Sequence, residues 1–420
     1  MASVRPLAER IRIDSASLND KIHYLASISG TRLAYSEQDI RARSVVLDLM
    51  RGVGLAVSID AAGNLVGRRD GHQQLSPITF GSHVDTVREA GPYDGVLGVM
   101  AAIECIRAVR DAHYTTLHPL EVIVFANEEG QQFGALCGSR ALLGLINEKD
   151  LQQRDESGRT FADAIRAIGG DPAQLSSSIR KPGSIAAFLE LHIEQGPTLE
   201  RARTPIGIVE GISGISHTYV AITGTAAHSG TTDMEARNDA LVAAARLVIC
   251  VEQLARQKQC RVATVGQLTV APNAINIIPG TVTLTIELRD LDAAKIGAAL
   301  GRLQQEAAEI ALQGGVRIEL AEREPIQPVP CSPLIKEAIR QACTDLGVKF
   351  ENLASGAGHD AQIMAKLGPM GMIFVPSRGG ISHSPREFTS AEDCALGAQV
   401  LLDTILHLDE RLSTGMRPQP

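Results

Sequence analysis

The sequence contains no tryptophan, and aromatic residues make up only 3% of its 420 residues. A chain of this length still has to bury a large apolar core, so leucine, isoleucine, valine and alanine must supply that core. The hydrophobic share of 44% and the charged share of 21% are ordinary for a folded globular chain. The composition therefore favours a soluble globular protein and points to no specialised class.

A long hydrophobic run and an excess of basic residues are also missing. No stretch reaches the roughly 20 apolar residues that a membrane-spanning helix needs. The N-terminal segment lacks the apolar centre of a signal peptide. The net charge is -8 and no basic patch stands out, which argues against nucleic acid as a partner. We predict a cytoplasmic protein without a membrane or nucleic-acid partner.

The seven cysteines are dispersed and none forms a C-x-x-C pair. An odd, scattered set is typical of reduced thiols in a cytosol and not of a disulfide framework. We expect most of them to be small buried apolar residues.

The length and the order of the apolar segments predict two domains. In the first half, short apolar strands such as 120–130 and 186–196 alternate with helical segments such as 95–112. This alternation indicates an α/β domain, a mostly parallel sheet with helices on both faces.

From residue 213 the pattern changes to β-α-β-β-α-β, the order of a ferredoxin-like α+β domain. A segment with four prolines, 323–333, then leads back to the first domain as an extended hinge. The sequence thus predicts a domain made of 1–212 and 330–420, into which 213–329 is inserted.

Histidines and carboxylates occur where five segments of the first domain are expected to end. In an open α/β sheet, the carboxyl ends of the strands form the ligand-binding edge. The segments are GSHVDT with His83 and Asp85, PYDG with Asp94, NEEG with Glu128 and Glu129, LELHIEQG with His192, Glu194 and Gln195, and GISHS with His383.

Taken singly, each of these residues also fits an ordinary structural role. Asp94 fits the N-cap of a helix, adjacent glutamates fit a surface turn, and a lone histidine is more often a core or loop residue. Together, three histidines and several carboxylates at one edge match the ligands that two divalent ions and an open water position need. Asp85 would orient the ring of His83. Nitrogen and oxygen ligands without cysteine suit Zn²⁺ or Mn²⁺ and permit Co²⁺ or Ni²⁺.

Nine motifs, spread in order over about residues 30–400, resemble one family. They are GSHVDT, YDGVLGV, NEEGQQFG, GSRALLG, LHIEQGP, AHSGTT, PNAINIIPG, SGAGHDAQ and SHSPREFT. The sequence is similar to the hydantoinase/carbamoylase amidases, a group that holds N-carbamoyl-L-amino-acid hydrolase, allantoate amidohydrolase and β-ureidopropionase. This group belongs to the two-metal aminoacylases and exopeptidases.

The resemblance implies roles for the residues at the sheet edge. It makes Glu128 the general base and Asp85 the partner of His83. The ligands that it implies are Asp94 bridging both ions, His83 and His192 at one ion, and Glu129 and His383 at the other.

The resemblance also implies substrate contacts in the inserted domain, which would act as a lid and dimerisation domain. His228 would stabilise the oxyanion, and Asn276 and Arg289 would hold the substrate carboxylate. Because lid residues of this family reach the partner's site, a homodimer is implied. Gln195, Gly356 and Gly358 would meet the ureido end. Read without the family, these residues fit loop, edge-strand and turn roles.

Two positions near His228 depart from the family pattern, Asp233 and Asn238. They leave the lid geometry and the substrate preference open. The expected reaction is hydrolysis of an N-carbamoyl-L-amino acid to the amino acid, ammonia and CO₂. The alternatives are allantoate amidohydrolase or β-ureidopropionase activity, an aminoacylase or dipeptidase of the wider class, and a catalytically silent metal-binding protein.

Overall fold

The computed structural model describes residues 11–413 and divides the chain into two compact units. The first unit runs up to Glu210 and resumes at Cys331, and the inserted unit is Gly211–Pro330. The sequence pattern predicted an inserted domain of residues 213–329, which differs from the observed bounds by one or two residues.

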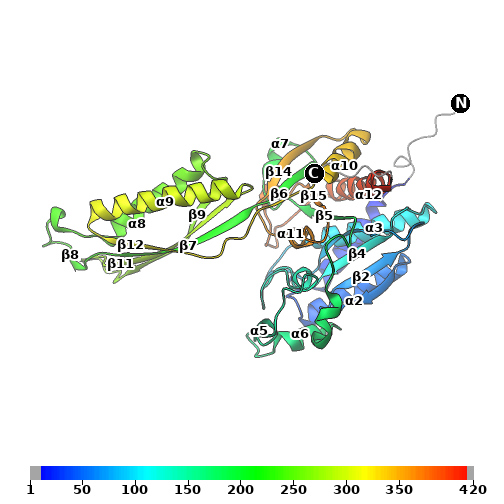
Figure 1. Ribbon diagram of the computed structural model, residues 1–420, viewed down its shortest axis with the longest axis horizontal. Coiled ribbons are helices and arrows are strands. Elements are labelled where there is room, and N and C mark those ends of the chain that lie inside the picture. The colour runs from blue at the N-terminus through cyan, green and yellow to red at the C-terminus, as the bar shows by residue number, and fades with distance from the viewer. Residues whose placement is uncertain (1–10, 414–420) are drawn as a thin grey trace. The chain divides into compact units, whose positions relative to one another are not determined.

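The first unit is built on a sheet of nine strands in the described residues, in the order β1-β2-β4-β3-β5-β15-β6-β13, with β14 also paired to β6 (Figure 1). The strands of this sheet are β1 Ala56–Ile59, β2 Leu65–Arg69, β3 Ile78–His83, β4 Leu120–Phe125, β5 Ala187–Ile193, β6 Ile206–Ile212, β13 Val329–Pro330, β14 Phe350–Ser355 and β15 Met370–Val375. The end of β6 and the whole of β13 are the two points where the chain enters and leaves the inserted unit.

The four central strands β4, β3, β5 and β15 are parallel to one another. Every residue of these strands is buried, so both faces of the sheet centre are covered. The outer pairs β1–β2, β2–β4, β6–β15 and β6–β13 are antiparallel. The α/β class is confirmed, with the parallel arrangement confined to the centre, where the carboxyl ends of four strands meet at one edge.

Helices of the first unit pack on this sheet and on one another. α3 contacts β3, β4 and β5, and it also packs against α1 and α12. The helices are α1 Ser15–Ile28, α2 Glu37–Gly52, α3 Val96–Asp111, α4 Cys137–Ala141, α5 Glu148–Leu151, α6 Phe161–Ala167, α7 Thr198–Ala202, α10 Pro333–Asp345, α11 Asp360–Met364 and α12 Ala391–Ser413.

Almost every residue of α3 is buried, because this helix lies between the sheet and the outer helices. Its small residues at Gly98, Ala101 and Ala102 allow that close packing. A Cβ at Gly98 would lie 2.4 Å from the Leu191 carbonyl oxygen of β5. The start of α3, beside the carboxyl ends of β3 and β5, is therefore held firmly in place.

The inserted unit has the predicted β-α-β-β-α-β order. Its main strands form an antiparallel four-stranded sheet in the order β12-β7-β11-β9, which is the ferredoxin-like arrangement. The elements are β7 Gly214–Thr223, β8 Ala227–His228, α8 Ala240–Arg256, β9 Val262–Ala271, β10 Ile277–Ile278, β11 Thr281–Asp290, α9 Ala293–Gly314 and β12 Arg317–Glu322.

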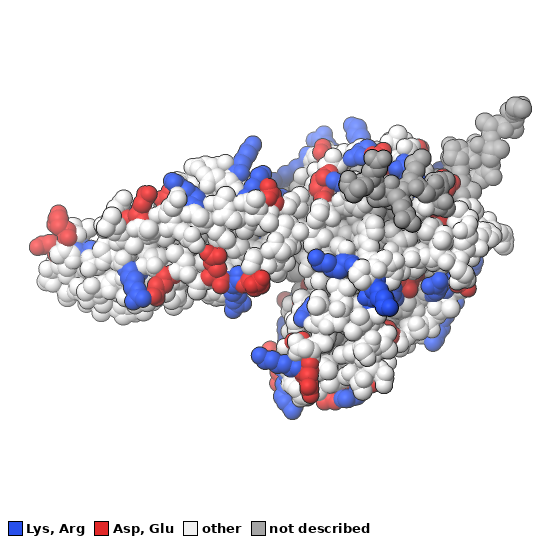
Figure 2. All heavy atoms as spheres, viewed as in Figure 1, with Lys and Arg blue, Asp and Glu red and all other residues white. Residues whose placement is uncertain are grey.

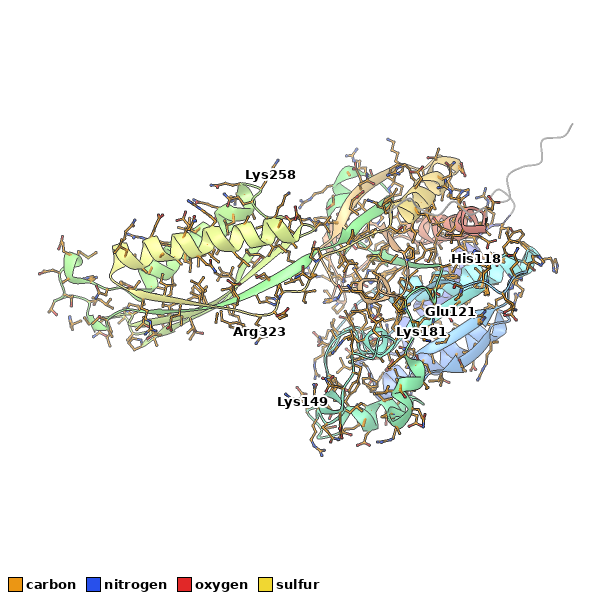
Figure 3. All side chains as sticks on the ribbon, viewed as in Figure 1. His118, Glu121, Lys149, Lys181, Lys258 and Arg323 are labelled. Atoms are coloured by element: carbon orange, nitrogen blue, oxygen red, sulfur yellow. The ribbon has the colours of Figure 1, made fainter. Side chains whose placement is uncertain are left out.

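Helices α8 and α9 cover one face of this sheet (Figure 1). Buried and more exposed residues alternate along β7 and β11, as expected for strands with one covered face. On the more exposed face, the guanidinium of Arg323 lies 4.6 Å from the centre of the Tyr219 ring (Figure 3). Side-chain oxygens of Asp239 and Asp292 cap the starts of α8 and α9.

All seven cysteines are free, and six of them are buried. Among the described residues, no helix is both long and apolar enough to cross a bilayer. Basic and acidic side chains are interspersed on the visible face of each unit (Figure 2). On this face of each unit, neither sign dominates.

Candidate metal centre

Each of the four central strands of the first unit delivers a histidine or a carboxylate to the same edge. His83 is the last residue of β3, and His192 lies near the end of β5. Glu128 and Glu129 follow β4, and His383 lies in the loop after β15. Asp94 comes just before α3, whose start lies at this edge. The sequence prediction that these residues share one edge agrees with this arrangement.

The opposite edge has different chemistry. Glu121, near the start of β4, forms an ion pair with Arg180 at 2.6 Å. Figure 3 labels Glu121 and the neighbouring Lys181 in this part of the unit. The charges of this pair cancel, whereas the edge formed by the carboxyl ends of the strands gathers several carboxylates.

The carboxylate of Asp94 lies between the histidines, with each oxygen facing a different group. Oδ1 is 3.2 Å from His192 Nε2 and 3.6 Å from His83 Nε2. Oδ2 is 3.2 Å from His383 Nε2, which in turn lies 3.6 Å from Glu129 Oε1. Two groups thus share Asp94, the geometry that a carboxylate bridging two cations requires.

The first group consists of Asp94, His83 and His192. Both imidazoles turn Nε2 toward the Asp94 carboxylate. His83 Nδ1 donates to the Asp85 carbonyl at 3.0 Å, and His192 Nδ1 donates to the Ile193 carbonyl at 2.9 Å. Each Nε2 is therefore unprotonated in the neutral ring and can bind a metal.

The backbone before α3 has to adopt an unusual conformation to place Asp94. Gly95 has φ of 65°, and its amide lies 3.2 Å from His192 Nε2. A Cβ there would stand 2.5 Å from the ring of His83. Only glycine fits this position, so the YDG motif has a direct steric reason.

Burial makes this edge unfavourable for negative charge alone. Burial, with nearby carboxylates such as Asp360, raises the pKa of Glu128 well above its ordinary value. Burial and the Asp94 charge raise the pKa of Glu129 to about 7. Glu129 Oε1 is buried without a hydrogen-bond partner among the described residues. Cations would neutralise these charges and bind that oxygen, so the side chains fit two divalent ions.

Glu128 lies at the boundary of the first group. Its Oε2 is 3.8 Å from His83 Nε2, and with Glu129 and His83 it forms a further possible ligand group. A raised pKa suits a carboxylate that takes up and releases a proton. This position therefore fits the general base that the resemblance implies.

Asp85 has a role that differs from the expected one. Its carboxylate accepts hydrogen bonds from the backbone amides of Glu128 and Glu129, both at 3.2 Å. The carboxylate oxygen lies 3.8 Å from His83 Nδ1, while the backbone carbonyl of Asp85 lies at 3.0 Å. The backbone carbonyl of Asp85 thus orients His83. The Asp85 carboxylate instead holds the turn that carries both glutamates.

Glu387, a buried positioning residue of the site, was not predicted from the sequence. Its Oε1 accepts from the backbone amides of Tyr93 and Asp94, at 2.8 and 3.1 Å. Ser382 donates to Glu387 Oε2 at 2.7 Å and lies 2.9 Å from Asp94 Oδ2. Glu387 therefore ties the loop of His383 to Asp94. It lies within the SHSPREFT motif, which was the only signal available.

A second missed feature is a buried polar layer next to His192. The His359 ring centre lies 4.6 Å from that of His192. Glu190 accepts from Ser82 at 2.7 Å and from the Ala361 amide at 3.2 Å, and Asp360 accepts from Ser139 at 2.5 Å. Burial lowers the pKa of His359 well below its ordinary value, so a neutral imidazole packs against His192.

Three predicted substrate contacts lie in the first unit. Gln195 Nε2 donates to Asp94 Oδ2 at 2.8 Å, and Gln195 Oε1 is buried without a partner among the described residues. Gly356 and Gly358 lie in the loop between β14 and α11, the same loop that carries His359. Gln195 therefore reaches the centre itself, and the two glycines belong to a loop that contacts it.

The other predicted contacts lie in the inserted unit and are split between two places. Pairing of β8 with β10 puts His228 opposite Ile277, and the Ser229 amide donates to the Asn276 carbonyl at 3.0 Å. Arg289 lies near the far end of β11, where its Nε donates to Glu287 at 2.7 Å. His228 and Asn276 are thus neighbours, and Arg289 is remote from both within this unit.

The two departures from the family pattern, Asp233 and Asn238, follow His228 in the sequence. Asp233 precedes a short 3₁₀ turn and is exposed. The Asn238 carbonyl accepts from the Thr225 amide at 2.9 Å. A Cβ on Gly315 would lie 2.5 Å from the Asn238 side-chain oxygen, so Asn238 packs closely against the end of α9. Asn238 thus has a packing role.

Comparison with known families agrees with this geometry. The model of peptidase family M20/M25/M40 matches residues 79–407, which span the strand ends, the inserted unit and the loop of His383. The chain belongs to this family. The family is metal-dependent, which agrees with the shared ligand groups around Asp94.

Relatives place this M20 chain among the hydantoinase/carbamoylase amidases, as the motifs predicted. An N-carbamoyl-L-amino acid amidohydrolase of Geobacillus stearothermophilus is 42% identical over 90% of this chain and 93% of its own. The allantoate amidohydrolase of Bacillus subtilis is 35% identical over 93% and 97%. A hydantoinase/carbamoylase family amidase from Burkholderia multivorans has a TM-score of 0.89 at 33% identity, covering 95% of this chain and 98% of that one.

Proposed function

We propose that this M20 enzyme hydrolyses the carbamoyl C–N bond of N-carbamoyl-L-amino acids, giving the amino acid, ammonia and CO₂. The observation that carries the proposal is Asp94, whose two oxygens face two separate ligand groups. Relatives named N-carbamoyl-L-amino-acid amidohydrolases, 37–42% identical over most of the chain, support the substrate class.

The ligand assignment follows the two groups. His83 and His192 would hold one divalent ion, Glu129 and His383 the other, and Asp94 both. The nitrogen and oxygen donors suit Zn²⁺ or Mn²⁺, and Co²⁺ or Ni²⁺ are compatible. Bound there, the ions would lower the pKa of an intervening water and polarise the ureido carbonyl.

The chain's own residues would then move the proton and orient the substrate. Glu128 takes a proton from the attacking water and gives it to the leaving nitrogen. Asp85 keeps Glu128 in place through the backbone amides of the turn. His228 donates to the oxyanion, while Asn276 and Arg289 bind the substrate carboxylate. Gln195 and the loop of Gly356 and Gly358 face the ureido end.

We also propose that the working enzyme is a homodimer with shared sites. Thr281 and Arg289 are eight residues apart on β11, a distance of about 25 Å along a strand. His228 and Asn276 lie before the start of that strand, so one inserted unit cannot bring all three residues to one substrate. A second copy supplying His228 and Asn276 resolves this separation.

The seven free cysteines support a reducing, cytoplasmic location.

Allantoate hydrolysis is the second candidate, because the allantoate amidohydrolase of Bacillus subtilis matches nearly the whole chain. The decisive test is ammonia release by the Mn²⁺-loaded protein from N-carbamoyl-L-methionine, N-carbamoyl-β-alanine and allantoate. We expect turnover of the first, lost in Glu128→Gln. Preference for allantoate would favour the second candidate, and turnover of acetylated or peptide substrates alone would refute both.

Mixing two inactive variants tests the shared site. If His228→Ala and Glu128→Gln chains exchange, hybrid dimers carry one intact site, so activity recovers to about a quarter of the unmodified level. No recovery after proven subunit exchange would contradict the shared arrangement. A monomer by light scattering would contradict the dimer itself.

A further inference from the structure

We propose that the loop after β8 is a clasp that holds His228 as a neutral donor with its proton on Nε2, and that Arg237 is the positioning residue of this clasp. The clasp comprises residues 228–237. The inference rests on the proposed role of His228 at the oxyanion, but its structural part can be measured without any substrate or metal.

The tautomer follows from one hydrogen bond. The backbone amide of Gly230 donates to His228 Nδ1 at 3.1 Å. A ring nitrogen that accepts a hydrogen bond carries no proton in neutral imidazole, so the proton must be on Nε2. A proton on Nδ1 would point at the Gly230 N–H, and two donors facing each other cannot form a hydrogen bond.

The opposite nitrogen is left available. In residues 11–413, His228 Nε2 has no protein partner, and the side chain is exposed. An N–H held ready in this way matches what stabilisation of an oxyanion demands. His83 and His192 show the reverse arrangement, because their Nδ1 atoms donate and their Nε2 atoms carry the lone pair.

Glycine at position 230 fits this arrangement sterically. A Cβ there would lie 3.3 Å from His228 Cε1 and 3.6 Å from Nδ1. The first distance is tighter than ordinary van der Waals contact, so a larger residue would push the ring away from the amide that fixes its tautomer.

Arg237 closes the clasp from the other side. Its Nη2 donates to the Ser229 carbonyl at 2.6 Å and its Nε donates to the Thr232 carbonyl at 3.1 Å. The Thr232 hydroxyl in turn donates to the His228 carbonyl at 2.9 Å. One planar guanidinium thus ties both sides of the turn that contains Gly230.

The backbone on both sides of the clasp is anchored. The Ser229 amide donates to the Asn276 carbonyl at 3.0 Å, which joins the clasp to the strand pair β8–β10. Asp239, two residues after Arg237, caps α8 through the amides of Leu241 and Val242. Arg237 therefore acts between two fixed points, and its loss would free the turn without unfolding the unit.

The test is a side-chain ¹⁵N spectrum of the full-length protein labelled at histidine, with His228 assigned by His228→Gln. We expect a protonated Nε2 and an unprotonated Nδ1 for His228 at alkaline pH. In Arg237→Gln this pattern should give way to a mixture of tautomers. Arg237→Lys, which keeps the charge and one donor, should retain part of it. Arg246→Gln, on the exposed side of α8, is the matched control and should leave the spectrum unchanged.

Kinetics provide the second readout. A misoriented oxyanion donor weakens the transition state alone, so Arg237→Gln should lower kcat by about tenfold to a hundredfold with little change in KM. A proton found on His228 Nδ1, or a spectrum of Arg237→Gln identical to that of the unmodified protein, would overturn the clasp. Absence of ammonia release from any ureido substrate would instead overturn the proposed function and leave the tautomer assignment standing.

Discussion

The two units prepare their functional residues in opposite ways. In the first unit, His83, Asp94 and His192 are almost completely buried, and each has several partners within the same chain. In the inserted unit, His228 is exposed. A cation site needs dense, preorganised ligands, whereas a substrate-closing surface must stay accessible until substrate arrives.

Histidine tautomers show the same contrast at the level of single atoms. Main-chain carbonyls accept from Nδ1 of His83 and His192, so that Nε2 faces Asp94 and is the nitrogen left to bind a cation. A main-chain amide fixes His228 so that an N–H faces outward. In our proposal, one residue type thus serves as metal ligand in one unit and as hydrogen-bond donor in the other, according to the backbone group that its Nδ1 meets.

The strongest test of this comparison is Asp94→Asn. Asparagine keeps the size but removes the charge that both ligand groups share, so we expect both ions to be lost and activity to fall at least about a thousandfold. Metal content by mass spectrometry and ammonia release measure the two effects. Asp403→Asn, at a buried aspartate of α12, is the control. Two ions retained in Asp94→Asn would show that Asp94 is not the bridge.

A second test concerns the positioning of the centre. Glu387→Gln replaces one carboxylate oxygen by a donor, so it weakens the hold on the Asp94 backbone or on Ser382. We expect the metal dissociation constant to rise about tenfold to a hundredfold. Titration calorimetry with Mn²⁺ measures it, and Glu392→Gln on the exposed side of α12 is the control. Unchanged affinity would mean that Glu387 only stabilises the fold.

The corresponding test in the inserted unit is Glu287→Gln. Glu287 accepts from Arg289 at 2.7 Å and lies 2.8 Å from His217 Nε2. Glutamine removes the charge that holds Arg289, so the Arg289 guanidinium should become more mobile. We therefore expect KM for carboxylate substrates to rise about tenfold with metal content unchanged. The exposed Glu319 of β12, changed to glutamine, serves as control. A loss of metal here would break the division of roles between the units.

A last test, of stability and not of activity, concerns a buried carboxylate outside the centre. Burial raises the pKa of Asp403 to about 7, above its value in the unfolded chain. Protonated Asp403 therefore favours the folded state, and this stability is lost as pH rises from about 4 through 7. Asparagine does not ionise, so Asp403→Asn does not lose this stability as pH rises. The free energy of unfolding of the variant, relative to that of the unmodified protein, should therefore increase by on the order of 3 kcal/mol from pH 5 to pH 8. Thermal melts at both pH values measure the gain, and equal shifts at both would refute it.

Much of the centre was predictable because its candidate ligands follow apolar strands. His83, Glu128 and His192 stand at or just after β3, β4 and β5, and the alternating pattern indicated a sheet whose strand ends meet. The β-α-β-β-α-β order of the inserted unit was readable for the same reason, since each element has its own apolar period. Local pattern thus fixed both the fold class and the ligand candidates.

Long-range partner choice was not predictable. Glu387 meets the amides of Tyr93 and Asp94 across almost three hundred residues of sequence. Asp85 uses its carbonyl for His83 and its carboxylate for the glutamate turn, a division that a two-residue spacing cannot reveal. Such choices depend on which groups are brought within about 3 Å by folding.

The sequence by itself therefore determined the α/β class, the inserted unit, the family and the residues able to bind cations. Only the tertiary structure decided that the two oxygens of Asp94 face two groups and that His228 carries its proton outward. It also separated Arg289 from His228 along the length of β11. The physical reason is that composition and periodicity act locally, whereas hydrogen-bond geometry and strand length act only once distant segments are in place.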